Sequence, residues 1–559
     1  MIRTFNTHSI RKQRELTGRY WNFTPCQGDY AGESFKVATP SCFESYPKFA
    51  NYRGQGEYST TFEAQGNIRL EFKGVSHTAE VFLDGRKIAE HYNAYTIFDA
   101  VCTDLKPGVH TLMVRADNRF SEKSALHIPN DYMTYGGIIR PIVLEEVRAA
   151  YIQYVHVTPY RANGKWNARV TVKLKNVFSK DSVSKEEKRF DLALELAGLN
   201  VMLSDIDITT QQEITTECVF ENVEAWTPEH PQLYEVQVRL LQKGMVYDDL
   251  IDRFGFREIH VSGKEIYLND KKIRIKGLCR HEDHPQFGCA LPFAAMAADL
   301  ELIKDLGANS IRTSHYPNDE IFLDMCDENG ILVWEENHAR GLSEEAMRNS
   351  NFEWQAEQVI TEMIPAHYNH PSIYIWGILN ECASETEYGR ECYRRQFDLI
   401  RSLDTSRLCS FASCKIKTDI CLDLPDVVSY NIYPLWYHDT PVEEYLDDLY
   451  QWIQRDTKGS GKPFLVTEIG AGGLYGYRNA YHSKWTEEYQ AQALEKQLTA
   501  VLSYKDCMGV YIWQFCDIRI SDECFAGRPR TMNNKGIVDE YRRAKLAYDV
   551  VKRIYHEIN

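Results

Sequence analysis

The sequence has 559 residues, which at roughly 100–200 residues per domain predicts three or four domains. Its 64 Lys and Arg residues against 80 Asp and Glu residues give a formal net charge of −16, and this acidity, with no long basic run, argues against nucleic acid as a partner. The 15 cysteines form no Cys-x-x-Cys pair, and neither an apolar leader nor a run of ~20 apolar residues is present, so we expect free thiols, no membrane span and a cytoplasmic location.

The first part of the chain, residues 1–150, has the pattern of strands and turns. Residues 68–72 alternate apolar and polar side chains with period two, as a half-buried strand does. Residues 79–83 are followed by Asp84-Gly85, which is a strong hairpin signal. Short strands separated by turns predict a β-sandwich here.

The next part, residues 151–260, continues the β pattern. Good alternating strands are expected at residues 168–174 and 236–240. The length of this part suits a small immunoglobulin-like sandwich.

From residue 261 to residue 559 the pattern changes to alternating strands and helices. Helical stretches such as residues 293–306 and 485–503 separate most of the strands, although residues 415–422 barely make a helix. Eight such units over about 300 residues are typical of a (β/α)8 barrel. The expected strands are residues 273–278, 310–316, 332–337, 373–381, 408–413, 427–433, 464–470 and 509–515.

Two carboxylates end predicted strands of this barrel, where active sites of the fold lie. Glu381 closes the fourth strand and Glu468 ends the seventh. Hydrolysis of a glycoside with retention needs two carboxyl groups ~5–5.5 Å apart, one to protonate the leaving oxygen and one to attack the anomeric carbon. We predict that this pair does so, the alternative being that each glutamate only pairs with an arginine of the barrel.

The run Asn369-His370-Pro371-Ser372, followed by Trp376 and Asn380-Glu381, resembles the acid/base signature of glycoside hydrolase family 2. The resemblance covers nearly the whole chain. It implies a jelly-roll-like sandwich over residues 1–150, an immunoglobulin-like sandwich over 151–260 and a catalytic (β/α)8 TIM barrel over 261–559. Further motifs similar to those of the family are residues 226–234, 252–257, 277–283 and 307–317.

This resemblance implies roles for individual residues. Glu381 takes the position of the general acid/base, Glu468 that of the nucleophile, and Tyr433 that of a tyrosine that orients the nucleophile. The implied activity is that of a retaining β-glycosidase, which works by double displacement through a covalent glycosyl-enzyme. Ile469 departs from the tyrosine that glucuronidases of the family often carry there. Implied substrate-binding positions are Asp131, His281, Asn380, Asn431, Tyr437 and Trp513.

Asn533 and Lys535 indicate the sugar. They resemble a motif by which β-glucuronidases hold the C6 carboxylate, and an ammonium group with an amide donor favours a carboxylate over a neutral hydroxymethyl group. Tyr437 assists in that motif, and Arg530 would add a positive charge, although its spacing to Asn533 differs from the usual one. We therefore predict terminal β-D-glucuronides as substrates, either small-molecule conjugates or oligosaccharides.

Three alternatives stay open. A family 2 β-galactosidase or β-galacturonidase would use the same two glutamates, and a galacturonide differs from a glucuronide only at C4. A non-catalytic carbohydrate-binding protein would have a degraded barrel site. His281-Glu282-x-His284 lacks the spacing of a zinc helix, and the chain has no Gly-x-Gly-x-x-Gly or Walker-type loop, so we predict no metal and no cofactor. Family analogy predicts a homo-oligomer.

Overall fold

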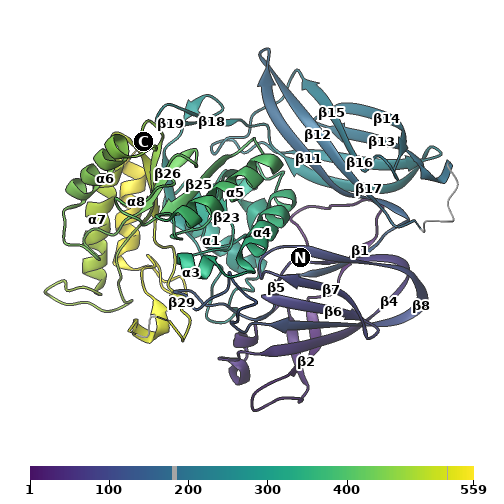
Figure 1. The fold of residues 1–559 in the computed structure, drawn as a ribbon, viewed down its shortest axis with the longest axis horizontal. Helices are drawn as coiled ribbons and strands as arrows, with labels where there is room; N and C mark the ends of the chain where they lie inside the picture. The colour runs from purple at the N-terminus through teal and green to yellow at the C-terminus, as the bar shows by residue number, and fades with distance from the viewer. Residues whose placement is uncertain (179–185, 525–526, 559) are drawn as a thin grey trace.

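Antiparallel sheets form from the first half of the chain and a closed parallel barrel from the second. The computed structural model describes residues 1–178, 186–524 and 527–558. In Figure 1 the barrel and its helices occupy one side of the molecule, and two antiparallel β bodies lie one above the other on the opposite side. The predicted fold class, two β-sandwiches followed by a (β/α)8 barrel, is confirmed.

The first body is an eight-stranded antiparallel sheet in the order β1-β10-β4-β8-β6-β7, with β2 and β3 attached beside β4. Its core includes Trp21, Phe72 and Leu112, all buried. The predicted hairpin at Asp84-Gly85 joins β6 to β7, and both residues have positive φ, as a type I′ turn requires. The strands are β1 (Gln13–Glu15), β2 (Arg19–Pro25), β3 (Phe35–Thr39), β4 (Gln55–Phe72), β6 (Thr78–Leu83), β7 (Arg86–Tyr92), β8 (Phe98–Asp117) and β10 (Ile142–Glu146).

The second body consists of two antiparallel sheets that share one hydrophobic core, with the orders β11-β12-β15 and β14-β13-β16-β17. The predicted strands at residues 168–174 and 236–240 lie within β12 and β16. The strands are β11 (Ala150–Ala162), β12 (Lys165–Asn176), β13 (Arg189–Leu196), β14 (Leu199–Asp207), β15 (Glu213–Phe220), β16 (Tyr234–Gln242) and β17 (Met245–Phe254).

Eight parallel strands, β21 to β28, close into a barrel. Most of their residues are buried because side chains fill the interior and helices cover the outside. Within the described residues 414–426, between β25 and β26, the chain makes turns and no helix. The strands are β21 (Ile275–Cys279), β22 (Ser310–Thr313), β23 (Leu332–Glu336), β24 (Ile373–Gly377), β25 (Leu408–Ser413), β26 (Val427–Asn431), β27 (Phe464–Ile469) and β28 (Cys507–Ile512).

In the residues that the structure describes, seven longer α-helices and one short one accompany the barrel. Within the described part of the chain, no helix combines the length and the apolar composition that crossing a membrane requires. The helices are α1 (Phe293–Asp305), α2 (Glu320–Asn329), α3 (Glu344–Met347), α4 (Phe352–Ala366), α5 (Glu387–Leu403), α6 (Val442–Asp456), α7 (Glu487–Ser503) and α8 (Leu546–Glu557). Shorter elements are β5 (Val75–Ser76), β9 (Gly137–Ile138), β18 (Ile259–Ser262), β19 (Glu265–Leu268), β20 (Lys271–Lys272), β29 (Ile518–Arg519), β30 (Met532–Asn533), η1 (Phe43–Ser45), η2 (Pro47–Phe49), η3 (Glu186–Lys188) and η4 (Pro529–Thr531).

The connection from β8 to β9 packs the first body against the mouth of the barrel. The hydroxyl of Tyr135 donates to Asp283 Oδ2 at 2.7 Å, and the hydroxyl of Tyr132 lies 3.0 Å from His338 Nε2. Both tyrosines belong to the same hydrophobic core as the barrel residues around them. The neighbouring residue Asp131 is therefore held at the barrel mouth.

Candidate active site

Glu381 and Glu468 line one cavity of about 230 Å³ at the carboxyl ends of the barrel strands. Glu468 lies in β27, and Glu381 follows β24, where its backbone N–H donates to the Ala412 carbonyl at 2.9 Å. The structure therefore brings together the two carboxylates that the sequence placed 87 residues apart, 468 − 381 = 87. The other lining residues are Asp131, Arg340, Cys414, Ile416, Asn431, Tyr433, Tyr437, His438, Tyr445, Trp513, Arg528 and Lys535.

Glu468 is almost completely buried, and each of its carboxylate oxygens accepts a hydrogen bond. Arg312 Nη1 donates to Oε1 at 2.9 Å, and the Tyr433 hydroxyl donates to Oε2 at 2.6 Å. Burial and the negative charge of Glu381 raise the pKa of Glu468 to about 8, against the opposing effects of Arg312 and Tyr433. The two hydrogen bonds fix the carboxylate in one orientation, which a nucleophile requires.

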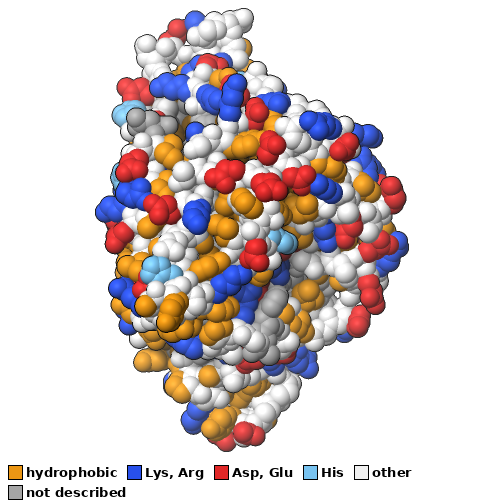
Figure 2. Space-filling model, turned by 90° about the vertical axis from the view of Figure 1, so that its left-hand side faces the viewer, with side chains coloured by type: hydrophobic (Ala, Val, Ile, Leu, Met, Phe, Trp, Pro, Cys, Tyr) orange, Lys and Arg blue, Asp and Glu red, His pale blue; other side chains and the backbone are white. Residues whose placement is uncertain are grey.

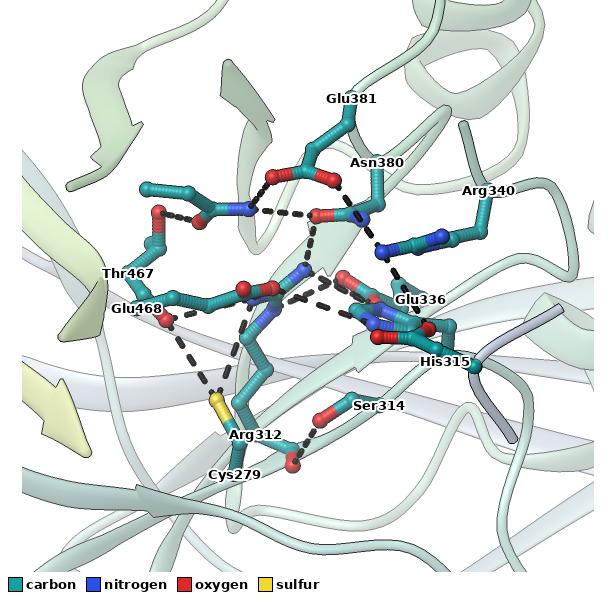
Figure 3. Close-up of polar contacts among 12 residues, drawn as sticks. Cys279, Arg312, Ser314, His315, Glu336, Arg340, Asn380, Glu381, Thr467 and Glu468 are labelled. Carbon is teal, nitrogen blue, oxygen red and sulfur yellow. Dashed lines mark hydrogen bonds and ion pairs between the residues drawn. The ribbon is translucent and has the colours of Figure 1, made fainter. Parts of the chain in front are cut away.

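Arg312 is the centre of the buried polar network beneath the cavity (Figure 3). Its guanidinium group donates to Glu336 at 3.0 and 3.1 Å and to Asn380 Oδ1 at 2.7 Å, besides Glu468. A planar guanidinium group with five N–H donors holds several acceptors in a fixed mutual geometry. Asn380, predicted to bind substrate, is buried beside this network and does not itself line the cavity.

Glu381 has a more open environment than Glu468, with 17% of its side chain exposed. Asn431 Nδ2 donates to its Oε1 at 3.0 Å, and Arg340 Nη2 lies 3.4 Å from its Oε2. Leu379 and Glu381 have φ values of 48° and 54°, a conformation that costs non-glycine residues of order 1–3 kcal/mol and that clusters at functional sites. Access to solvent suits a group that must exchange protons.

Three cations converge on the side of the cavity where Lys535 lies. The buried Lys535 Nζ donates to the Tyr437 hydroxyl at 2.9 Å and lies 5.1–5.7 Å from the ring centroids of Tyr433, Trp436 and Tyr437. Arg340 and Arg528 lie 3.2 and 3.4 Å from the carboxylate of Asp131. Burial lowers the pKa of the Lys535 ammonium group, with the Tyr437 hydroxyl opposing that effect.

Asp131 is the carboxylate that the first body contributes to this group. Asn533 Nδ2 donates to its Oδ2 at 3.3 Å. Burial works against its ionisation, but Arg340 and then Arg528 outweigh burial and lower its pKa. The cavity as a whole is lined by three cations and three carboxylates, and the cations Arg340, Arg528 and Lys535 lie on the side where Asp131 is the acidic partner. Figure 2 shows both signs of charge interspersed over one face of the molecule.

Four predicted site residues do not line the cavity: Asn380, Asn533, Arg530 and His281. The side chain of Arg530 is 56% exposed and pairs with Glu540, so the added charge expected from Arg530 comes from Arg528 instead. His281 is buried behind Trp513, with ring centroids 5.4 Å apart and an angle of 90° between the rings.

Sequence reasoning missed six cavity residues: Arg340, Cys414, Ile416, His438, Tyr445 and Arg528. Arg340 stands four residues after Glu336, which ends β23, so the rule that strand ends carry the site contained a weak signal for it. Arg528 is two residues from Arg530, and no local pattern distinguishes the two.

Asp324, Asp327 and His370 are a buried group whose ligand atoms lie within 4.8 Å of one another, the geometry of a possible metal site. Arg3 already binds both oxygens of Asp324, and His370 Nδ1 lies 2.5 Å from Asp327 Oδ2. These contacts satisfy the carboxylates within the protein, and none of the three residues lines the cavity.

Comparisons with known proteins agree with this geometry. Residues 259–559 match the family model described as glycosyl hydrolases family 2, TIM barrel domain, and residues 150–257 match the model described as glycosyl hydrolases family 2. The chain is similar to a GH2 β-galacturonidase from Eisenbergiella tayi solved with galacturonate, with 58% identity, a TM-score of 0.95 and full coverage of both chains.

Two relatives with lower sequence identity are named as β-glucuronidases. A putative β-glucuronidase of Formosa agariphila is 28% identical over 90% of this chain, which spans 64% of that protein's length. A β-glucuronidase of Streptococcus agalactiae is 27% identical over 87% of this chain and 84% of the relative.

Proposed function

The chain belongs to glycoside hydrolase family 2, and from that membership we propose that it is a retaining β-glycosidase that releases terminal β-linked hexuronic acids, with β-D-galacturonides favoured. The observation that carries the proposal is the position of Lys535 and Arg528 in the cavity that holds both glutamates. Cations beside a buried site favour a sugar acid over a neutral sugar.

In the proposed mechanism Glu468 attacks the anomeric carbon while Glu381 gives its proton to the glycosidic oxygen. The C–O bond to the leaving group breaks, and a covalent glycosyl-enzyme forms on Glu468. Glu381, now a carboxylate, then takes a proton from water, which attacks the same carbon and releases Glu468. Tyr433 and Arg312 support this chemistry because they hold the attacking carboxylate in place.

The C6 carboxylate of the substrate is assigned to Lys535 and Arg528. Asn533, rather than contacting the sugar directly, supports this group through its hydrogen bond to Asp131. The volume of the cavity, about 230 Å³, is smaller than the range of about 300–1000 Å³ that encloses drug-sized ligands. It therefore suits a single sugar ring, with the leaving group extending to the rim.

Galacturonide is placed before glucuronide because the 58% identical protein over its full length is a β-galacturonidase. This reverses the order expected from the sequence, and β-glucuronides stay as the second candidate because the Formosa and Streptococcus proteins carry that name. Conjugates or oligosaccharides as natural substrates, a homo-oligomeric state and a cytoplasmic location remain predictions. A non-catalytic role is disfavoured by the intact carboxylate pair.

A panel of four p-nitrophenyl β-D-glycosides tests the proposal: galacturonide, glucuronide, galactoside and glucoside. We expect kcat/KM to be highest for the galacturonide and at least roughly 30-fold lower for both neutral sugars, because a charge-assisted contact contributes on the order of 2–4 kcal/mol. A galactoside or glucoside that reacts faster than both uronides would overturn the uronide assignment.

A further inference from the structure

The cavity has a second wall that the proposed chemistry does not use. It consists of Cys414, Ile416, His438 and Tyr445, here called the leaving-group wall. Cys414 and Ile416 follow β25, His438 follows β26, and Tyr445 lies in the first turn of α6.

The leaving-group wall borders Glu381. The backbone N–H of Glu381 donates to Ala412, two residues before Cys414, so the start of this wall lies beside the proposed acid/base. Arg340 lies 3.4 Å from the carboxylate of Glu381 and also pairs with Asp131, which lies beside the cations assigned to the sugar carboxylate. Atoms beyond the glycosidic oxygen therefore leave the sugar past Glu381 on the side of Cys414 and Ile416.

The loop that carries Cys414 and Ile416 is held in place from beneath. The buried carboxylate of Asp419 accepts hydrogen bonds from Ser413 Oγ at 2.5 Å, from Ser384 Oγ at 2.6 Å and from the Cys421 backbone N–H at 2.7 Å. A wall formed before the ligand arrives avoids the cost of ordering it on binding.

The charged residues of the same loop are already paired away from the cavity. Lys415 Nζ donates to Glu385 at 2.9 Å, and Lys417 Nζ lies 2.7 Å from Asp448. Neither lysine lines the cavity.

The side chains of the leaving-group wall offer flat and apolar surface. The rings of His438 and Tyr445 are stacked at 27°, with centroids 5.7 Å apart, and Ile416 packs partly against the barrel core. None of the four side chains carries a permanent charge, and none is a carboxamide of the kind that reads sugar hydroxyls.

We propose that the leaving-group wall binds a flat, uncharged aromatic leaving group, with the ring against Ile416 and Tyr445. This inference rests on the proposed glycosidase function and names the class of leaving group for it. An aromatic ring matches such a surface because its burial needs no compensating hydrogen bonds.

Substrates with leaving groups of different size distinguish an effect of the leaving-group wall on the rate from an effect of the catalytic pair. β-D-Galacturonosyl fluoride has a leaving group too small to contact the wall, whereas p-nitrophenyl β-D-galacturonide places an aromatic ring on it. A β-linked disaccharide with a terminal galacturonate places a second sugar there. We expect Ile416→Ala and Tyr445→Ala to lower kcat/KM for the aryl substrate by roughly 3- to 30-fold and to leave the fluoride within about twofold.

Two further variants serve as controls. Tyr445→Phe keeps the ring and should keep the aryl kcat/KM, and Lys417→Ala changes the same loop outside the cavity and should change neither substrate. Equal losses on the fluoride and the aryl substrate would overturn the inference, because the wall would then act on the sugar or on folding. A loss confined to the disaccharide, or a Tyr445→Phe variant as slow as Tyr445→Ala, would overturn the aromatic class.

A failure of the proposed function gives a different result from a failure of the inference about the leaving-group wall. If the wild-type enzyme cleaves the corresponding galactosides or glucuronides faster than both galacturonides, the sugar assignment is wrong, and the same comparison of fluoride and aryl substrates is made on the preferred sugar. The difference between the two substrates then still decides the role of the wall.

Discussion

At the scale of single residues, the site consists of ionisable side chains that are buried from water and paired with charged or hydrogen-bonding partners. Glu468 illustrates the balance: burial and Glu381 disfavour its charge, whereas Arg312 and Tyr433 favour it. Losing one partner in such a place leaves an uncompensated charge, so single substitutions here should have large and specific effects.

Glu468→Ala should remove hydrolysis almost entirely, because no glycosyl-enzyme can form. Added azide, a small anion that fits where the carboxylate was, should restore turnover of an activated aryl uronide and give a product of inverted configuration. The measurement is the initial rate with and without azide. A variant that keeps more than a few per cent of the wild-type rate without azide would remove Glu468 from the nucleophile role.

Glu381→Gln should remove the alkaline limb of the pH profile of kcat/KM, because the glutamine side chain has no proton to lose. The mechanism needs Glu381 protonated while Glu468 is a carboxylate, so loss of the Glu381 proton at higher pH ends acid catalysis in the wild type. p-Nitrophenyl β-D-galacturonide is the substrate for both profiles. Glu391→Gln, on the exposed face of α5, should keep the alkaline limb, and an alkaline limb that persists unchanged in Glu381→Gln would contradict the assignment.

Lys535→Ala should lower kcat/KM for uronides by roughly 30- to 1000-fold, the equivalent of on the order of 2–4 kcal/mol for a lost charge-assisted contact. Any activity on galactosides or glucosides should stay level or rise, because a neutral sugar gains little from the ammonium group. Rates on the four-substrate panel provide the measurement. A uronide kcat/KM within threefold of wild type would exclude Lys535 from carboxylate binding.

At the scale of elements, the turn at η4, directly before β30, decides which arginine reaches the cavity. Arg530 and Thr531 have φ values of 59° and 54°, so the chain turns sharply through η4. Arg528 lies on the cavity side of that turn, and Arg530 points to Glu540. Two arginines that look equivalent in the sequence therefore have different surroundings.

Arg528→Ala should lower kcat/KM for uronides by roughly tenfold or more, because the charge beside Asp131 and Lys535 is lost. Arg530→Ala is the matched control: Arg530 does not line the cavity, so kcat/KM for uronides should change little, whereas stability should fall because the buried Glu540 loses this partner. Parallel assays of the two variants on the galacturonide provide the test. Equal losses for both variants would contradict the arrangement of this turn.

At the scale of the whole molecule, the barrel site is completed by the first β body. Arg140 makes one of the ties: its Nη2 donates to Glu282 and to the Pro317 carbonyl, each at 2.8 Å, with both partners of the ion pair almost fully buried. This contact holds the segment after Asp131 against the loops of β21 and β22.

Arg140→Ala should destabilise the protein by about 3–5 kcal/mol, because Glu282 stays buried without its partner. Arg115→Ala, which removes a half-exposed arginine paired with Glu57 and Glu80, should cost only about 0–1 kcal/mol. Thermal and denaturant unfolding measure both. Similar unfolding profiles for the two variants would show that the buried tie contributes nothing to the union of the β body and the barrel.

The amino-acid sequence by itself determined the class of each β region, the barrel strands and the two glutamates. Runs of buried residues with period two or with helical spacing are local, and the carboxyl end of a barrel strand follows directly from where the run stops. Glu381 and Glu468 were found for that reason. The stretch at 415–422 was already a poor helix in the sequence, and the structure makes turns there.

Only the tertiary structure decided which cations line the cavity, and which side chains form the leaving-group wall. Arg340, Arg528, Asp131 and Lys535 come from separate segments, and their contacts depend on how the first β body docks and how one short turn is wound. Side-chain direction in a turn depends on a few backbone dihedrals with no sequence period. Long-range charge pairing has no local signature either, so the sequence indicates the two glutamates, whereas their charged neighbours follow only from the tertiary fold.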